Sequence, residues 1–346
     1  MRTISGSDSM VPTKGEDMPQ PLVSMLLIAY DQERFVEEAI RGALSQTYKH
    51  LEIIISDDAS SDGTFATIED ALRNYSGPHR IIVRRNETNI GIGGHLSLLA
   101  QLAHGELLVV AAGDDVSAAE RCEALVNHWI AHGRTPDLIA SDLMDMDAVG
   151  NIYGRIAPTV LDGYKEFDDW AAHRPWVVGA SHAWTRRLFD RFGAMMANLA
   201  AEDQVMTLRA ILTGGAVSLS CPLVNYRRGG LSGKRLFRSV DDKVAQIRRS
   251  NYVGLVELAQ LQKDADVAGI GGRMQSLLAP RLARERFTQA VFEPTGVGRR
   301  IAAAWRAHDV GSGHRARMLF YSICPMVYVP LFFLKKILGK SRGAAP

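Results

Sequence analysis

Short apolar runs alternate with amphipathic stretches along the first 140 residues of the chain. Three of these runs, at 23–31, 51–58 and 107–115, are rich in Val, Ile, Leu and Ala and end in polar or acidic residues. Continuous apolar runs of this length between turn residues are typical of strands that are buried on both faces of a parallel sheet. The pattern therefore predicts three buried strands and a shorter one at 80–85.

Amphipathic helices are predicted between these strands. In the stretch 32–46 the apolar residues recur at helical spacing and form one stripe, and 63–75, 92–103 and 118–131 are also predicted to be helical. Another strand is predicted at 137–141. The alternation of strand and helix indicates an α/β fold with a mostly parallel sheet and flanking helices.

The pattern is looser after residue 145. A turn is predicted at 147–151, and three tryptophans fall in the segment 170–184, which has no clear periodicity and which we interpret as loop-rich. A helix is predicted at 202–213 and a strand at 217–226. From residue 235 onward, the spacing of apolar residues predicts a packed helical region.

The net charge of +2 conceals an uneven distribution. Residues 234–346 hold 20 Lys and Arg against 8 Asp and Glu, a balance of +12, whereas residues 1–233 have a balance of −10. A basic C-terminal part indicates an anionic partner, which could be a nucleic acid or a membrane. The segment 318–338 is apolar and aromatic with basic flanks, and this favours a membrane surface.

The apolar run of this segment is slightly shorter than the ~20 residues that span a bilayer, and two prolines interrupt it. We therefore expect the segment to lie on or dip into a membrane surface, with a buried pair of C-terminal helices as the alternative.

Three widely spaced cysteines exclude a disulfide framework and a cysteine zinc site. Residues 1–20 are polar without the apolar stretch of a signal peptide, so we expect a disordered leader.

Acidic residues at the ends of the apolar runs are the strongest candidates for chemistry. Asp57-Asp58 follow the second run and Asp114-Asp115 the third. Ligands of open α/β sheets bind beyond the carboxyl ends of the strands, so these loops are expected to meet at one cleft. Adjacent carboxylates stay ionised together most easily beside a cation. The later pair thus predicts a divalent metal site, although it could also be a simple polar turn.

The order of the motifs resembles the inverting glycosyltransferases of family 2, which have the nucleotide-diphospho-sugar (GT-A) fold. The resemblance covers residues 22–232, about two thirds of the chain. Each motif is weak by itself, and the set is specific in this order and spacing. It is carried by Ile28-Ala29-Tyr30-Asp31, Ser45-Gln46-Thr47-Tyr48, Asp57-Asp58-Ala59-Ser60-Ser61-Asp62-Gly63-Thr64, Asn89-Ile90-Gly91, Gly105-Glu106, Gly113-Asp114-Asp115, Glu202-Asp203 and Tyr226-Arg227.

The resemblance implies a set of contacts to a nucleotide sugar and a metal ion. In the family the early acids face the nucleotide base, and the asparagine segment shapes the nucleotide pocket. The chain has Ala112 where the family often has another acid, which leaves Asp114 and Asp115 to bind ribose and metal. Asp115, with Asp114, is expected to hold Mn²⁺ or Mg²⁺, which would neutralise the departing diphosphate. The nucleotide-sugar contacts are expected from Ala29, Tyr30, Asp31, Asp57, Asp58, Arg84, Asn89, Gly91, Asp114 and Arg227.

Glu202-Asp203 resembles the acidic pair that supplies the catalytic base of the family. An inverting transfer needs one carboxylate near the acceptor hydroxyl to take its proton. We assign this role to Asp203, and Glu202 is expected to orient it. The alternative is that both acids only stabilise the N-terminus of a helix. His95 and His182 are expected to be helix or pocket-wall residues rather than ligands.

The resemblance implies a glycosyltransferase that moves a sugar from a nucleotide-diphosphate donor to an acceptor hydroxyl with inversion. Family members commonly build cell-surface polysaccharide or lipid-linked glycans, so we expect a glycan or lipid-linked acceptor. A cytoplasmic location, peripheral to the inner face of the membrane, and no nucleic-acid partner are expected. One alternative is a nucleotidyltransferase, which would need a glycine-rich basic loop where residues 29–33 are acidic. Another is a sugar-nucleotide-binding module without catalysis.

The motifs also suggest a division of the chain. The catalytic domain is expected at 21–233, with a nucleotide-binding half at 21–116 and an acceptor half at 117–233. A helical, basic region follows at 234–346.

Overall fold

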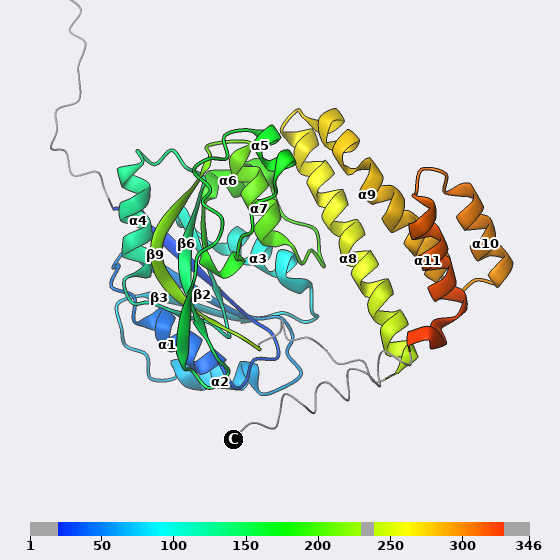
Figure 1. Ribbon diagram of the computed structural model, residues 1–346. Coiled ribbons are helices and arrows are strands. Elements are labelled where there is room, and N and C mark those ends of the chain that lie inside the picture. Colours follow the sequence, from blue (N-terminus) through cyan, green and yellow to red (C-terminus); the bar gives the residue numbers. More distant parts are fainter. Residues whose placement is uncertain (1–19, 230–238, 329–346) are drawn as a thin grey trace, which may run out of the picture.

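The computed structural model describes residues 20–229 and 239–328. These residues form an α/β fold around one mixed, nine-stranded sheet, and a helical region follows it (Figure 1). Some predicted features lie outside the described residues, namely 1–19 of the leader, the segment 230–238 and the apolar residues 329–338. The predicted domain boundaries stay predictions.

The first four long strands are parallel, as predicted. They are β1 (Val23–Ala29), β2 (Leu51–Asp57), β3 (Arg80–Arg85) and β4 (Leu107–Ala112). Their order in the sheet is β3-β2-β1-β4, so β1 and β2 have strand neighbours on both sides. All three apolar runs of the sequence therefore end at the same edge of the sheet.

Helices cover both faces of these strands. They are α1 (Val36–Leu44), α2 (Thr64–Leu72), α3 (Gly91–Leu102) and α4 (Arg121–Ala131). Alternate residues of a strand face opposite sides. Accordingly Met25 and Leu27 belong to the core beneath α1, α2 and α4, whereas Leu26 belongs to the core that includes α3. The helix predicted at 32–46 is shorter than expected, because the Gln32 carbonyl accepts from both Phe35 and Val36 in a preceding turn.

The second half adds antiparallel strands to the predicted, mostly parallel sheet. It contributes β5 (Val116–Ser117), β6 (Leu138–Met146), β7 (Ile152–Ile156), β8 (His182–Thr185) and β9 (Ala216–Arg227). β9 runs parallel to β6, but β8 is antiparallel to both β4 and β6. β5 pairs antiparallel with β9, and β7 pairs antiparallel with β6. The result is a mixed sheet in which β8 joins the two halves.

The segment 170–184 is more ordered than the loop-rich prediction. It contains part of α5 (Phe167–Ala172), the short 3-10 helix η1 (Gly179–Ser181) and most of β8, and α6 (Arg186–Phe192) follows. Trp170 and Trp184 are fully buried in the core, whereas Trp176 is 55% exposed. The predicted turn after β6 and the helix that begins at Glu202, α7 (Glu202–Ile211), are both confirmed.

The predicted C-terminal helical region is confirmed. It consists of α8 (Val240–Val267), α9 (Gly271–Phe292), α10 (Val297–Arg306), α11 (Ser312–Ile323) and the 3-10 turn η2 (Pro325–Tyr328). Figure 1 shows α8 and α9 side by side, with α8 nearer the sheet and α10 and α11 beyond α9. The first part of the predicted membrane segment thus belongs to α11, where Met318 and Leu319 pack against the core of α9.

A buried ion pair fastens this region to the sheet domain. Arg209 of α7 donates to both carboxylate oxygens of Asp264 in α8, at 2.7 and 2.9 Å, and neither side chain is exposed. Burying two charges is favourable only when their geometry is good and their remaining hydrogen-bonding groups are satisfied. Gln260 completes the site by donating to Asp264 at 2.8 Å.

Candidate active site

A cleft of about 560 Å³ opens at the carboxyl ends of β1, β2 and β4. Ala29, Tyr30, Asp58, Asn89, Gly91, Asp114 and Asp115 line it from the side of these strands. Glu202 and Asp203, at the start of α7, line the same cleft. The structure therefore brings together nine of the residues that the sequence singled out. Asp31, Asp57, Arg84 and Arg227 are not among the residues that line the cleft.

Asp58 organises the edge of the cleft where α3 begins. Its carboxylate accepts from the side-chain nitrogen of Asn86 at 2.6 Å and from the backbone N–H groups of Ile90 and Gly91 at 3.0 and 2.9 Å. Gly91 has a φ of 74°, which glycine adopts without strain. These bonds occupy the first N–H groups of the helix, so the α3 N-terminus is capped by protein and is not open to a phosphate.

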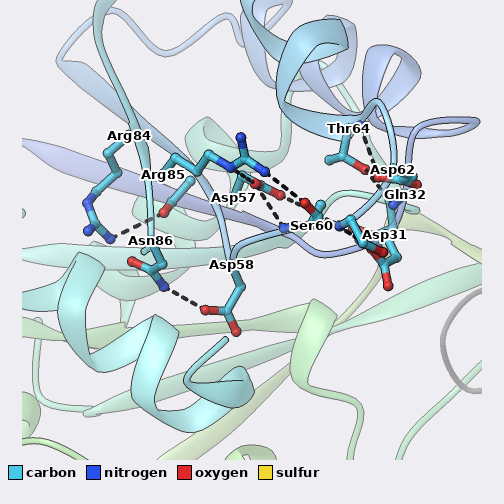
Figure 2. Close-up of polar contacts among 12 residues, drawn as sticks. Asp31, Gln32, Asp57, Asp58, Ser60, Asp62, Thr64, Arg84, Arg85 and Asn86 are labelled. Carbon is cyan, nitrogen blue, oxygen red and sulfur yellow. Dashed lines mark hydrogen bonds and ion pairs between the residues drawn. The ribbon is translucent and has the colours of Figure 1, made fainter. Parts of the chain in front are cut away.

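Asp57 and Asp31, unlike Asp58, do not line the cleft and instead make contacts within the loops around it. Figure 2 shows Asp57 pointing toward Arg85 and Ser60, away from the Asp58 carboxylate. Asp57 is fully buried and pairs with Arg85 Nε at 3.0 Å. Asp31, which is exposed, accepts from the Ser61 N–H at 2.9 Å and ties the loop after β1 to the loop after β2. Both acids hold loops that surround the cleft.

His95 lies in the wall of the cleft, as predicted, behind the Asp58 edge. Its Nε2 is 2.6 Å from Ser56 Oγ, and Arg84 approaches the same hydroxyl at 3.4 Å. Burial lowers the pKa of His95 to about 4, so the ring is neutral at physiological pH. Arg84 is thus linked through Ser56 to His95, which lines the cleft.

The turn after β4 brings two carboxylates to the centre of the cleft. Gly113 packs so closely on β1 that a Cβ there would lie 2.5 Å from Gln32 Oε1 and 2.9 Å from the Ala29 Cβ. Asp115 is buried and accepts from the Arg227 N–H at 2.8 Å. Burial, together with the charge of Asp114, raises the pKa of Asp115 well above its usual range. A cation beside the pair would remove this penalty.

The donor set fits a small hard cation. Both residues offer carboxylate oxygens, and Mg²⁺ is commonly bound by one or two carboxylates together with substrate phosphates instead of a complete protein cage. Within the described residues, no group of three or more His, Cys, Asp or Glu side chains is arranged to hold a metal by itself. An ion at Asp114 and Asp115 would consequently need further oxygens, such as those of a substrate phosphate, to complete its coordination.

Arg227 and its neighbour Arg228 face different surroundings. The Arg227 guanidinium is enclosed, because it stacks over Phe35 at 4.7 Å, pairs with Glu38 and donates to the Asp114 carbonyl at 2.9 Å. Arg228 lines the cleft instead, and its Nε donates to Asp145 at 2.6 Å. In this structure Arg227 holds the Asp114–Asp115 turn, and Arg228 is the guanidinium at the cleft.

Glu202 and Asp203 lie in the first turn of α7, in the wall of the cleft beside η1. Glu202 is the deeper of the two, and burial, together with the charge of Asp203, raises its pKa to about 8. Burial also raises the pKa of Asp203. Gly179 allows this pair to approach η1, since a Cβ on Gly179 would lie 2.5 Å from Glu202 Oε1 and 3.5 Å from the Asp203 Cβ. Two adjacent carboxyls with raised pKa values in a cleft are typical of acid–base chemistry.

The segment 174–181 forms the rest of this wall. Its members Trp176, Val177, Val178, Gly179 and Ala180 all line the cleft. Arg121, which is fully buried at the start of α4, donates to the carbonyls of Val110 and Ala180 at 2.8 and 2.6 Å and so connects this wall to β4. Sequence reasoning named neither the residues of this wall nor Arg121. The signal for the wall was the group of three tryptophans at 170–184.

Comparison with known proteins identifies the domain. Residues 24–141 match the family described as "Glycosyl transferase family 2". The chain contains a family 2 glycosyltransferase domain. It is 34% identical over 140 residues to the putative glycosyltransferase EpsE of Bacillus subtilis, a match that covers 40% of this chain and 49% of EpsE. The chain thus spans about half the length of the curated relatives it matches most strongly.

Two further relatives extend this comparison. Over 94 residues the family 2 domain is 35% identical to "UDP-Glc:alpha-D-GlcNAc-diphosphoundecaprenol beta-1,3-glucosyltransferase WfaP" of Escherichia coli, covering 27% of this chain and 36% of WfaP. The crystal structure of S. aureus TarS 1–349 in complex with UDP-GlcNAc has a TM-score of 0.51 at 19% identity, over 88% of this chain and 87% of that one. The TarS likeness shows the same fold beyond the matched motifs.

Proposed function

We propose that the protein transfers a sugar from a nucleotide-diphosphate donor to an acceptor hydroxyl with inversion at the anomeric carbon. The observation that carries this proposal is that Asp114 and Asp115, which follow β4, line the same cleft as Glu202 and Asp203, which begin α7. One acidic pair suits a cation and a diphosphate, and the other suits proton transfer. An inverting displacement needs these two functions on opposite sides of the reacting carbon.

The donor would lie along the carboxyl ends of β1, β2 and β4. Tyr30 and Asp58 would contact the nucleoside, and Arg228 is the nearest cleft-lining guanidinium for the diphosphate. A divalent ion at Asp114 and Asp115 would supply charge neutralisation for the leaving diphosphate. The enclosed Arg227 would support this turn, and Asp31 and Asp57 would hold the loops around it.

Asp203 would act as the general base. Because Glu202 is the more deeply buried acid, it would keep its proton at neutral pH, and the ionised carboxylate of the pair would then be Asp203. The acceptor hydroxyl oxygen attacks the anomeric carbon while Asp203 takes the hydroxyl proton. The bond from that carbon to the phosphate oxygen breaks, and its electron pair leaves with the nucleoside diphosphate.

The printed names of the relatives guide the choice of substrates. WfaP transfers glucose from UDP-glucose to a sugar linked to diphosphoundecaprenol, and TarS was crystallised with UDP-GlcNAc. We propose a lipid-linked or polysaccharide acceptor of the same general kind for this chain. UDP-glucose and UDP-GlcNAc are therefore the first donors to examine.

We also propose that the C-terminal helical region contacts an anionic membrane surface. Val297, Ile301 and Trp305 of α10 recur at a spacing of four residues and are 49%, 40% and 74% exposed. Residues 297–317 hold five arginines and one acid, so this apolar stripe lies in a basic surrounding. No helix within the described ranges is long and apolar enough to cross a membrane.

Release of UDP from each donor, with and without Mn²⁺, tests the catalytic proposal. Asp203→Asn keeps the size of the side chain and removes its basicity, so we expect turnover to fall by about 10²–10⁴-fold with nearly unchanged donor affinity. Asp190→Asn, an exposed acid on α6 away from the cleft, is the matched control. Donor binding without turnover in the wild type would instead support a binding module. Turnover of Asp203→Asn within a few-fold of wild type would show that another group takes the proton.

A further inference from the structure

One large aromatic side chain is exposed in the part of the cleft that contains Asp203, the proposed general base. Trp176 is 55% exposed and lines the cleft, whereas Trp170 and Trp184, its neighbours in sequence, are fully buried. An indole is among the largest apolar side chains, and a protein that leaves one exposed in a concave site offers a flat apolar surface to a ligand.

The backbone around Trp176 is held in place on both sides. The Trp176 N–H donates to Thr159 Oγ1 at 3.0 Å, and its carbonyl accepts from the Thr159 N–H at 2.9 Å. The preceding carbonyl, of Pro175, accepts from Gln204 Nε2 at 2.8 Å. Both bonds to Thr159 and the bond from Gln204 fix the segment before any ligand arrives, which lowers the entropic cost of binding.

The same contacts place Trp176 beside the proposed base. Gln204, which holds Pro175, follows Asp203 directly in α7, and Gly179 on the other side of Trp176 abuts Glu202 and Asp203. The indole and the Asp203 carboxylate therefore belong to one wall. Asp114 and Asp115, the acids proposed for the metal, line the same cleft from the turn after β4.

We propose that Trp176 forms an acceptor subsite that stacks against the ring of a pyranose, so that the acceptor is the sugar end of a glycan. This inference rests on the proposed transferase function and names the acceptor class for the same site. One face of many pyranose rings presents C–H groups and is apolar, and it matches an indole face. The ring hydroxyls project sideways, where a polar side chain of the cleft such as Asp203 would meet them. An open-chain polyol or a bare lipid alcohol has no such face.

Transfer to a soluble probe tests this subsite. The probes are methyl β-D-glucopyranoside and methyl α-N-acetylglucosaminide, with glycerol as an acceptor that has no ring, and UDP-glucose and UDP-GlcNAc as donors. We expect the glycosides to accelerate UDP release and glycerol to have little effect. Trp176→Ala should raise the acceptor KM about ten-fold and leave the donor KM unchanged. Trp176→Phe, which restores a flat ring, should recover most of this loss.

Two controls make the result specific to the wall of the cleft. Trp305→Ala removes another exposed indole, on α10, and is expected to leave the KM of a soluble acceptor unchanged. Saturation-transfer NMR of the glycosides in the presence of UDP measures sugar binding without turnover, and Trp176→Ala should abolish that signal. The subsite and the transferase proposal can thus fail separately.

An acceptor KM of Trp176→Ala within two-fold of wild type would overturn the subsite while leaving the transferase proposal intact. Equal acceleration of UDP release by glycerol and by the glycosides would also overturn it. Glycoside binding that depends on Trp176 in a protein that never releases UDP would retain the sugar site and reject the catalytic proposal.

Discussion

Replacing Glu202 with glutamine is expected to stabilise the protein at alkaline pH and to change its stability little near pH 4.5. In the folded protein the pKa of Glu202 is raised by burial to about 8, from an ordinary value of 4.5. The native state therefore retains this proton over a range in which the unfolded chain releases it. Stability contributed by the protonated group is complete below about pH 4.5 and is lost progressively as the pH rises to 8.

The magnitude follows from the distance between the two pKa values. Each pH unit between 4.5 and 8 costs about 1.4 kcal/mol, so wild type loses about 3 kcal/mol by pH 7 and about 4 kcal/mol by pH 8 relative to a neutral side chain. Glutamine cannot ionise and escapes this loss. For a chain of this size 1 kcal/mol corresponds to roughly 2 °C in Tm, so the difference at pH 8 should approach about 8 °C.

Thermal unfolding of wild type and Glu202→Gln between pH 5 and pH 9 measures this difference. Glu69→Gln on the exposed face of α2 is the matched control, and it should follow the wild type at every pH. A difference between Glu202→Gln and wild type that stays constant from pH 5 to pH 9 would refute the reasoning. It would mean that Glu202 ionises as readily in the folded protein as in the unfolded chain, and the division of roles between Glu202 and Asp203 would lose its support.

Two further outcomes are expected. Asp115→Asn should weaken Mn²⁺-dependent binding of UDP at least ten-fold by calorimetry, since it removes one of two carboxylates from the proposed metal site; equal binding would reject that assignment. Trp305→Ala should reduce sedimentation with phosphatidylglycerol vesicles several-fold, whereas Tyr252→Ala, a comparably exposed aromatic on α8, should not. Equal loss in both variants would show that α10 has no special part in membrane binding.

The apolar runs predicted the cleft edge of the sheet well, because each ended where a buried strand ends. The pattern indicated buried parallel strands, and the pairing of β1 with β2 and β4 brings their carboxyl ends together. The pattern did not reveal β8. Its four residues are all buried between β4 and β6, so they show no alternation, and no turn signal sets them apart.

The sequence also could not show which of two adjacent polar residues faces the cleft. Neighbouring residues of an extended chain point to opposite sides, so Asp57 and Asp58, or Arg227 and Arg228, cannot be told apart by type. Their orientation depends on register and on distant partners. Asp58 faces the cleft because it receives three hydrogen bonds from Asn86, Ile90 and Gly91, and Arg227 turns inward onto Phe35. These partners are far away in sequence, and no local pattern announces them.

Helix α8 of the C-terminal region contacts the wall of the cleft that carries Trp176 and Asp203. Glu257 of α8 accepts from Arg174 at 3.0 Å, directly before the segment that presents Trp176. The pKa of Asp203 is raised by burial and also by the negative charge of Glu257. Glu257 lies outside the matched region 24–141, whereas Arg121, which also holds this wall, lies inside it. The wall that we propose for the acceptor therefore depends on α8 as well as on the matched region, so the match to the family does not by itself define that side of the cleft.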